Sequence, residues 1–195
     1  MLAPETTALV LLAAGRSERF GDTDKLAEPF LAEPLAFHVV RALESVPFQA
    51  RIAVVSGTKL DFAARGYRVV ENRRADSGQG HSLALCIDAA RETGASAVLV
   101  ALADMPRVTA AHIYRLFDAS EGPDTAVASS DGVQPRPPAL FGAAHFPALM
   151  ALDGDQGARR LIARGHHVVT SPGELVDIDT PEELAALRAL YGVAD

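Results

Sequence analysis

The sequence predicts an α/β protein built on a mainly parallel sheet, and three observations lead to this fold class. Residues 8–14 and 97–102 are continuously apolar, as expected of strands buried on both faces of a parallel sheet. Segments with helical spacing alternate with short strand-like runs along the rest of the chain. Both apolar runs lead directly into polar residues, at the end of a strand where ligands bind in open α/β sheets.

Length and composition indicate one globular domain. The chain has 195 residues, of which 49% are hydrophobic and 22% charged, so we expect residues 1–195 to form a single domain with its own core. The formal net charge of −7 argues against a nucleic-acid-binding surface. The one cysteine, Cys86, excludes an internal disulfide, and no apolar run approaches the ~20 residues that span a bilayer. We therefore expect a cytoplasmic protein that binds neither nucleic acid nor a membrane.

Helix and strand signals can be placed in order along the chain. Pro34 stands at a first helical position, and apolar residues follow it at helical spacing until Pro47 stops the run. Thr180 and Glu183 form a capping box, with Pro181 at the first position of the last helix. The expected helices are 34–46, 77–94, the segment from 109, 158–162 and 181–190, and the expected strands are 8–14, 51–56, 67–70, 97–102, 124–130, 138–141 and 166–170.

The strands expected at 124–130 and 138–141 are joined through Asp131-Gly132, a turn dipeptide. Pro135, Pro137 and Pro138 lie between the two runs or at the start of the second. Because proline cannot donate to a strand ladder, we expect this pair at an edge of the sheet or as an irregular excursion.

The loop after the first apolar strand carries the signals of a phosphate site. Gly15 and Gly21 allow tight turns, and Arg16, Arg19 and Lys25 place three cations on the loop or just beyond it. Backbone N–H groups and fixed positive charge are a usual means of holding a polyphosphate. The loop is neither a Walker A loop nor a dinucleotide fingerprint, because the residues of both patterns are absent. The alternative is an ordinary solvated loop between strand and helix.

Three later segments carry further candidate residues. Gly78 and Ser82 lie where a helix begins, with little side-chain bulk, so that a flat ligand could approach free N–H groups; the alternative is a simple helix cap. Asp104 follows the second buried strand, and the next helix starts too far downstream for Asp104 to cap it. Asp177 and Asp179 face the same side if the backbone is extended, and capping of the last helix needs neither of them.

Five motifs in order resemble those of the MobA-like NTP transferases, a family that includes the cytidylyltransferases and guanylyltransferases of the molybdenum cofactor. They are L-A-A-G-R-S-E-R-F-G with K-L from Leu12, G-x-x-x-S-L from Gly78, L-A-D-M-P ending at Pro106, G-D-x-G-A-R from Gly154 and D-I-D-T-P-E-E-L from Asp177. The resemblance covers nearly the whole chain and implies a three-layer, Rossmann-like nucleotidyltransferase fold with a mostly parallel mixed sheet. One departure is Arg136-Pro137-Pro138, where the family usually has G-H-P.

The implied reaction is nucleotidyl transfer, in which a phosphate oxygen of the acceptor attacks the α-phosphorus of an NTP and pyrophosphate leaves. The resemblance implies Mg²⁺ as the cofactor, held by Asp104 and Asp179. It implies catalytic roles for Arg16, Lys25 and Asp104. It further assigns Leu12, Ala13, Ala14, Gly15, Arg16, Arg19, Lys25, Gly78 and Ser82 to the nucleotide, and Arg136, Pro138, Asp155 and Arg159 to the acceptor.

The nucleotide and the acceptor are implied less directly. Relatives that use CTP tend to have L-A-A-G, as here, and the methyl group of Ala14 would crowd a purine more than a pyrimidine. The resemblance therefore implies CTP, a molybdopterin-type acceptor and a xanthine-oxidase-family molybdoenzyme as a candidate partner. Two alternatives stay open. One is a nucleotidyltransferase for another phosphorylated acceptor, such as a sugar or alditol phosphate. The other is a non-catalytic module that delivers the cofactor to a molybdoenzyme, against which the presence of Lys25, Asp104 and Asp179 argues.

Overall fold

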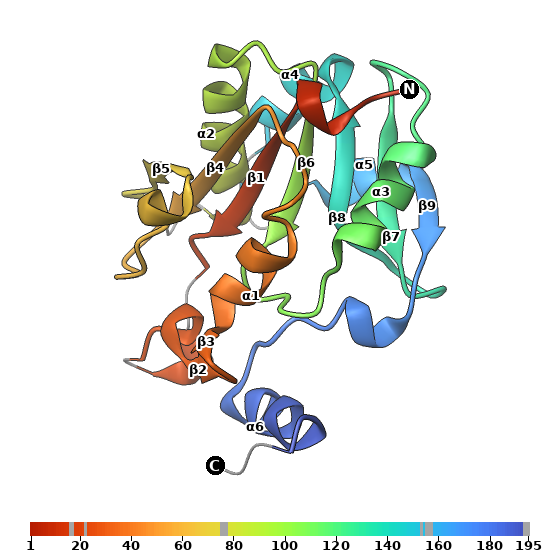
Figure 1. Cartoon of the computed structure of the whole chain (residues 1–195). Coiled ribbons are helices and arrows are strands. Elements are labelled where there is room, and N and C mark those ends of the chain that lie inside the picture. Colours follow the sequence, from red (N-terminus) through yellow and green to blue (C-terminus); the bar gives the residue numbers. More distant parts are fainter. Residues whose placement is uncertain (16–17, 22, 75–77, 153, 155–157, 193–195) are drawn as a thin grey trace.

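A computed structural model describes residues 1–15, 18–21, 23–74, 78–152, 154 and 158–192 of the chain. Within this part, seven strands form one sheet in the order β5-β4-β1-β6-β8-β7-β9 (Figure 1). Neighbouring strands run parallel, except that β8 is antiparallel to both β6 and β7. The predicted α/β fold with a mostly parallel mixed sheet is confirmed. The strands of this sheet are β1 (Thr7–Ala13), β4 (Ala50–Val55), β5 (Arg68–Glu71), β6 (Ala97–Leu102), β7 (Ala126–Ser130), β8 (Pro135–Gly142) and β9 (His166–Val169).

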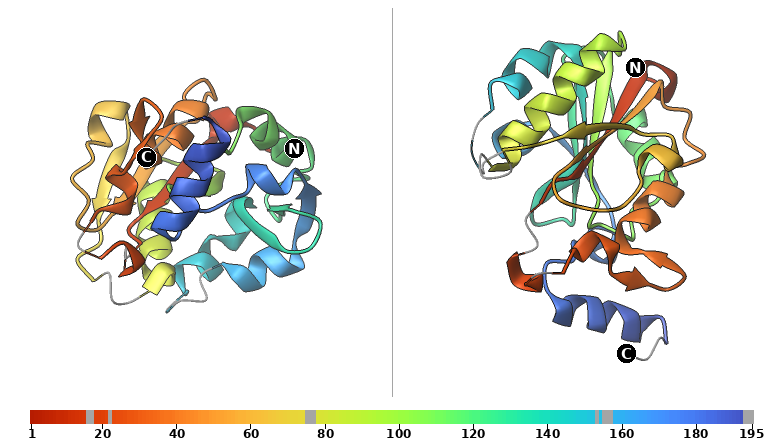
Figure 2. Two further views of the ribbon diagram at one scale, coloured as in Figure 1. Left: turned by 90° about the horizontal axis from the view of Figure 1, so that it is seen from below. Right: turned by 90° about the vertical axis from the view of Figure 1, so that its left-hand side faces the viewer.

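Helices cover both faces of the sheet and make the molecule three-layered (Figure 2). Because successive side chains of a strand point to opposite faces, Leu9 and Leu11 of β1 pack with α1 and α3, whereas Ala8 and Val10 pack with α2, α4 and α5. No helix in the described part of the chain is both long and apolar enough to cross a membrane. The helices are α1 (Leu35–Ala42), α2 (Gly78–Glu92), α3 (Ala110–Asp118), α4 (Phe146–Met150), α5 (Arg159–Arg164) and α6 (Pro181–Leu190).

A small additional cluster lies beyond the carboxyl edge of the sheet, at the bottom of Figure 1. It joins α6 to the short hairpin of β2 (Pro29–Phe30) and β3 (Glu33–Pro34). Phe30, Leu35, Ile178, Leu184 and Leu187 are its buried apolar residues. The cluster holds the C-terminal segment against the segment that follows β1, close to the candidate site.

The position of β8 corrects the prediction of an edge strand or an irregular excursion. This strand lies inside the sheet, between β6 and β7. Its contact with β6 begins only at Ala139, so Pro135, Pro137 and Pro138 all precede it. On the other side, the register with β7 shifts between Ala128 and Ser129. The prolines are tolerated because they lie where β8 extends past β6 and is paired on one side only.

Some helix boundaries also differ from those expected. Pro34 is the N-cap residue of α1 and not its first helical residue. Thr109 caps α3 through its hydroxyl, which accepts a hydrogen bond from the backbone N–H of His112, so Asp104 has no capping role there. The capping box of Thr180 and Glu183 at α6 is confirmed. The N-cap role expected of Asp155 falls outside the described residues.

Candidate active site

Three candidate side chains from distant parts of the sequence meet at the carboxyl edge of the sheet. Lys25 Nζ lies 2.8 Å from Oδ2 of Asp104 and 3.2 Å from Oδ1 of Asp179. Lys25 is only 7% exposed. A buried ammonium group is costly unless it is paired and hydrogen-bonded, and the two carboxylates supply both conditions.

A local turn positions Lys25. The residue begins the 3-10 helix η3 (Lys25–Ala27), and Asp24 caps this turn by accepting the backbone N–H of Leu26 at 3.1 Å. The other carboxylate oxygen of Asp24 accepts the hydroxyl of Thr58 at 2.6 Å. The loop after β1 is thereby fixed to the loop after β4. Sequence reasoning missed Asp24, because its partner lies 34 positions away.

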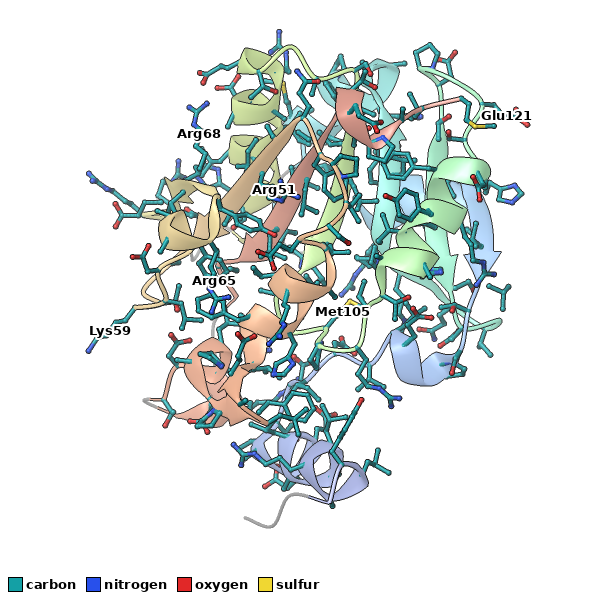
Figure 3. The ribbon with its side chains drawn as sticks, in the orientation of Figure 1. Arg51, Lys59, Arg65, Arg68, Met105 and Glu121 are labelled. Carbon is teal, nitrogen blue, oxygen red and sulfur yellow. The ribbon has the colours of Figure 1, made fainter. Side chains whose placement is uncertain are left out.

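Backbone hydrogen bonds bring Asp179 to Asp104. Asp104 is the second residue after β6 and precedes Met105, which is buried at the lower edge of the sheet (Figure 3). The carbonyl of Asp104 accepts the N–H of Ile178 at 3.0 Å, which docks the C-terminal segment beside it. The carboxylate of Glu183 accepts the N–H of Asp179 at 2.7 Å, so the first turn of α6 fixes that residue in place.

The electrostatics of the cluster favour a charged lysine. Burial by itself lowers the pKa of Lys25, but the carboxylates of Asp104 and Asp179 outweigh burial and raise the pKa above its ordinary value. Burial raises the pKa of Asp104, and Lys25 opposes this shift. Oδ1 of Asp104 is buried and has no hydrogen-bond partner among the described residues. One carboxylate oxygen of Asp104 can therefore still accept a ligand.

Further ion pairs surround the cluster. Arg19, whose side chain is 67% exposed, lies 3.5 Å from Oδ2 of Asp179. Arg136 lies 3.6 Å from Asp177 and 3.5 Å from Asp131. Asp104, Asp177 and Asp179 thus each face at least one cation.

The cluster borders a cavity of about 760 Å³ on the α2 and α5 side of the sheet. Its walls combine apolar and polar side chains. Such a combination is typical of small-molecule sites. The apolar lining includes Leu12, Leu83, Val100, Leu102, Phe141 and Ile162, and the polar lining includes Gln79, Asp104, Arg136, Arg159, Asp177 and Asp179.

A smaller cavity of about 200 Å³ lies at the loop after β1. Ala13, Ala14 and Gly15 line it, opposite Ser56 and Thr58 of the loop after β4. Gly21 also lines it and has a φ of +62°, so the tight turn predicted at this glycine is confirmed. Among the candidate nucleotide residues, Leu12 thus lines the larger cavity, whereas Ala13, Ala14 and Gly15 line the smaller one.

Asn72 is a buried polar residue that the sequence analysis did not select. It follows β5 at the carboxyl edge, is 1% exposed, and donates from Nδ2 to the hydroxyl of Ser82 at 2.8 Å. Ser82 itself lies in the first turns of α2, which begins at Gly78. An asparagine directly after a short strand was the available signal, because side chains in that position gather at the ligand edge of an α/β sheet.

A buried polar chain supports the segment that carries Arg136. Ser129 donates its hydroxyl to the carbonyl of Pro138 at 2.7 Å, so the Ser129 oxygen accepts from Nε2–H of His112, also at 2.7 Å. Nδ1 of His112 is buried without a partner in the described part of the chain. Pro138, a candidate acceptor residue, is therefore buried, and its carbonyl is held by the hydroxyl of Ser129. Arg136, in contrast, lines the cavity.

Arg16 and Asp155 lie outside the described residues. Cys86 is fully buried against the sheet, and burial raises the pKa of its thiol to about 12, as suits a core residue.

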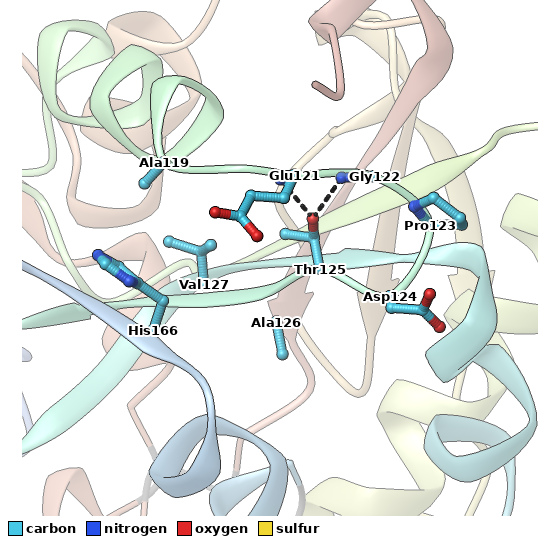
Figure 4. Close-up of a pocket in the computed structure, with 9 residues that line it drawn as sticks. All are labelled: Ala119, Glu121, Gly122, Pro123, Asp124, Thr125, Ala126, Val127 and His166. Atoms are coloured by element: carbon cyan, nitrogen blue, oxygen red, sulfur yellow. Dashed lines mark hydrogen bonds between the residues drawn. The ribbon is translucent and has the colours of Figure 1, made fainter.

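A third cavity, of about 350 Å³, lies at the opposite edge of the sheet, where β7 begins (Figure 4). Glu121, Asp124 and His166 are among its lining residues, and Thr125 Oγ1 accepts the backbone N–H groups of Glu121 and Gly122. None of the candidate residues lines this cavity. We do not assign it to the candidate site.

The family profile of the MobA-like NTP transferase domain matches residues 9–168. The chain belongs to the MobA-like NTP transferase family. It is 32% identical to the purine catabolism protein PucB of Bacillus subtilis over 92% of this chain and 94% of the relative. It is 30% identical to a molybdenum cofactor guanylyltransferase of Shewanella frigidimarina over 93% of this chain and 95% of the relative.

Solved structures agree with the MobA-like fold. A nucleotidyl transferase from Methanothermobacter thermautotroptrophicus aligns with a TM-score of 0.78 at 22% identity, covering 95% of this chain and 97% of that one. The manganese complex of Rv0371C from Mycobacterium tuberculosis aligns with a TM-score of 0.71 at 21% identity, covering 94% and 98%. The protein is therefore a MobA-like nucleotidyltransferase, with Lys25, Asp104 and Asp179 together at the edge of the sheet.

Proposed function

We propose that the protein transfers CMP from CTP to the terminal phosphate of a molybdopterin-type cofactor and releases pyrophosphate. The contact of Lys25 with Asp104 and Asp179 at the border of the large cavity carries this proposal. The full-length similarity to a molybdenum cofactor guanylyltransferase supports the acceptor class.

The reaction needs charge neutralisation more than proton transfer. A phosphate acceptor is already anionic at neutral pH, and it must approach an NTP that is also anionic. Catalysis therefore depends on positioning and on fixed positive charge. Lys25 and Arg19, together with Arg16, would hold the β- and γ-phosphates and stabilise the pyrophosphate as it leaves. Asp155, Arg159, Arg136 and Pro138 are our candidates for the acceptor side.

The donor set suits a divalent cation with oxygen ligands. Asp104 offers a buried oxygen that no described residue hydrogen-bonds, and Asp179 adds a second carboxylate. In the described part of the chain, no group of three or more His, Cys, Asp or Glu side chains could hold a metal. Two carboxylates match Mg²⁺, which usually binds one or two of them together with substrate phosphates. Bound there, the cation would neutralise and orient the α-phosphate. The manganese complex of the Mycobacterium tuberculosis protein supports a divalent cation here.

The choice of CTP depends on Ala14. This residue is 8% exposed, and it lines the small cavity with Gly15. Its methyl group leaves less room for a purine than a glycine would. GTP is the competing nucleotide, because the molybdenum cofactor relatives carry the name guanylyltransferase.

The lining of the large cavity supports the acceptor class, and similarity to a relative supports the partner enzyme. Arg136 and Arg159 provide cations on a cavity that also has a large apolar lining, as a phosphorylated heterocycle requires. The name of the PucB relative refers to purine catabolism, and xanthine is a purine, which supports a molybdoenzyme of the xanthine-oxidase family as partner. Arg136-Pro137-Pro138 in place of G-H-P favours, as a second candidate, another phosphorylated acceptor such as a sugar or alditol phosphate.

We also propose that residues 1–195 act as one domain and that the protein works in the cytoplasm. Two core clusters on either side of the same sheet support the first point. The buried free thiol of Cys86 supports a reducing compartment.

The test is a transfer assay with purified protein, Mg²⁺, molybdopterin and either CTP or GTP. We expect pyrophosphate release with CTP and a cytosine dinucleotide product identified by mass. Ala14→Gly should increase the use of GTP. Arg159→Met should raise the KM for the acceptor, whereas Arg160→Met, one position further along α5, should not. Pyrophosphate release only with a sugar phosphate, or none with any acceptor, would overturn the proposed acceptor.

A further inference from the structure

We propose that Lys25 is a built-in counter-ion that occupies the metal ligands until a nucleotide–metal complex displaces it. The ammonium group then leaves Asp104 and Asp179 for the phosphates of the nucleotide. This inference rests on the proposed function, because it takes the two aspartates as metal ligands.

The geometry makes lysine and metal mutually exclusive at these oxygens. Nζ of Lys25 lies within hydrogen-bond distance of one oxygen of each carboxylate, at 2.8 Å for Asp104 and 3.2 Å for Asp179. A magnesium ion binds carboxylate oxygens at roughly 2.0–2.1 Å. An ammonium group and a divalent cation on the same oxygens would therefore stand almost in contact and repel each other strongly. A cation that takes these same oxygens must move the ammonium group away, and a cation on the other oxygen of Asp104 would still lie close to the ammonium group and be repelled by it.

The charges around the site also favour displacement of Lys25 by a metal that arrives with a nucleotide. Lys25 and Arg19 balance Asp104 and Asp179, and Arg136 lies beside Asp177. A free divalent cation would add two positive charges to this balanced set. A cation that arrives on a triphosphate adds negative charge overall and gives the displaced ammonium group a new partner.

The fold allows the side chain to move without moving its backbone. Asp24 and Thr58 fix the turn that begins with Lys25. Asp24 and Leu26 of the same turn line the small cavity at the glycine loop, while Nζ reaches the edge of the large cavity. A lysine has a flexible four-carbon stem, so rotation of its side chain can carry the ammonium group from one cavity towards the other.

Metal and nucleotide should consequently bind with positive cooperativity. Free metal must break the ion pairs of Lys25, whereas metal with a nucleotide exchanges them for pairs with phosphate. By linkage, the nucleotide raises the affinity for the metal by the same factor as the metal raises the affinity for the nucleotide. Removal of the ammonium group should reduce this cooperativity.

The experiment measures Mn²⁺ binding by electron paramagnetic resonance of the free ion, with and without CTP and without any acceptor. The proteins are the wild type, Lys25→Met and Arg19→Met. Arg19→Met is the matched control, because it removes the same charge from the exposed side of Asp179. Asp104→Asn reports the binding that is independent of the site. Circular dichroism checks that each variant is folded, and Lys25→Gln replaces Lys25→Met if the latter does not fold.

We expect Lys25→Met to bind Mn²⁺ without CTP at least about tenfold more tightly than the wild type, because no charge-assisted hydrogen bond has to be broken. Arg19→Met should change this affinity by less than about threefold, as expected of an exposed pair. CTP should strengthen Mn²⁺ binding in the wild type and much less in Lys25→Met. If Lys25→Met binds Mn²⁺ without CTP no more tightly than the wild type, this inference is overturned and the proposed function is not. Absence of Asp104-dependent Mn²⁺ binding even with CTP would instead overturn the metal site of the proposed function.

Discussion

Lys25 and Asp104 are 79 positions apart in the sequence, and they form a 2.8 Å ion pair at the carboxyl edge of the sheet. Their contact follows from the topology, because β1 and β6 are parallel neighbours that end together, with Leu12 opposite Leu102. The loops that leave these two strands must therefore meet. The hydrogen bond from Ile178 to Asp104 then adds the C-terminal segment and its Asp179. Sheet order brings together three residues that the sequence separates widely.

Asp104→Asn should abolish turnover and preserve the fold. The amide keeps the size of the side chain but removes the negative charge that a metal and Lys25 both require. Pyrophosphate release should fall by at least about a hundredfold. The control is Asp177→Asn, which removes a carboxylate beside Arg136 and should cost much less. Unchanged turnover in Asp104→Asn would exclude Asp104 from the reaction.

Glu183→Ala should weaken both α6 and the site. The carboxylate of Glu183 accepts the N–H groups of Asp179 and Thr180, and its loss should lower the free energy of unfolding by about 1 kcal/mol. We also expect a higher metal concentration for half-maximal activity, because Asp179 loses its support. Glu182→Ala removes the same charge from the same helical turn without these bonds and serves as the control. Equal effects of the two substitutions, measured by urea unfolding and metal titration, would reject the supporting role.

His112→Gln should reduce the loss of stability between pH 7 and pH 5. Burial lowers the pKa of His112 below its ordinary value of 6.5. A group whose pKa is lowered by folding contributes stability above its unfolded pKa, and this contribution is lost as the pH falls through the folded pKa. Glutamine keeps an N–H near Ser129 and cannot be protonated in this range. We expect urea unfolding to show a smaller pH dependence in the variant, with exposed His166→Gln as the control for loss of an imidazole. If His112→Gln shows the same pH dependence of unfolding as the wild type, protonation of His112 is not its cause.

Much of the fold could be predicted from the sequence because fully buried strands leave continuous apolar runs. The prediction of strands at 8–14 and 97–102 is confirmed, with β1 and β6 shifted by at most one residue. The position of β8 could not be predicted in this way. Its prolines signal an edge, and their tolerance depends on how far β6 extends and on a register shift in β7. Both are properties of neighbouring strands.

The candidate site was likewise only partly predictable from the sequence. Lys25, Asp104 and Asp179 stand in recognisable motifs, and the structure brings them together. Glu183, which supports Asp179, also stands in a recognisable motif. Asp24 does not, because its partner Thr58 follows β4 and approaches only because β1 and β4 lie side by side. Asn72 and its hydrogen bond to Ser82 of α2 likewise belong to no motif that the sequence analysis used.

The most direct test of the central claim is a thermal-shift measurement with CTP, GTP, ATP and UTP in the presence of Mg²⁺, on the wild type and on Asp104→Asn. A ligand at a hundred times its dissociation constant stabilises a fold by ~2.7 kcal/mol, which is readily detected. We predict a Mg²⁺-dependent shift that is largest with CTP and is lost in Asp104→Asn. No shift with any nucleotide, or a shift that Asp104→Asn retains in full, would contradict a nucleotide–metal site at Lys25, Asp104 and Asp179.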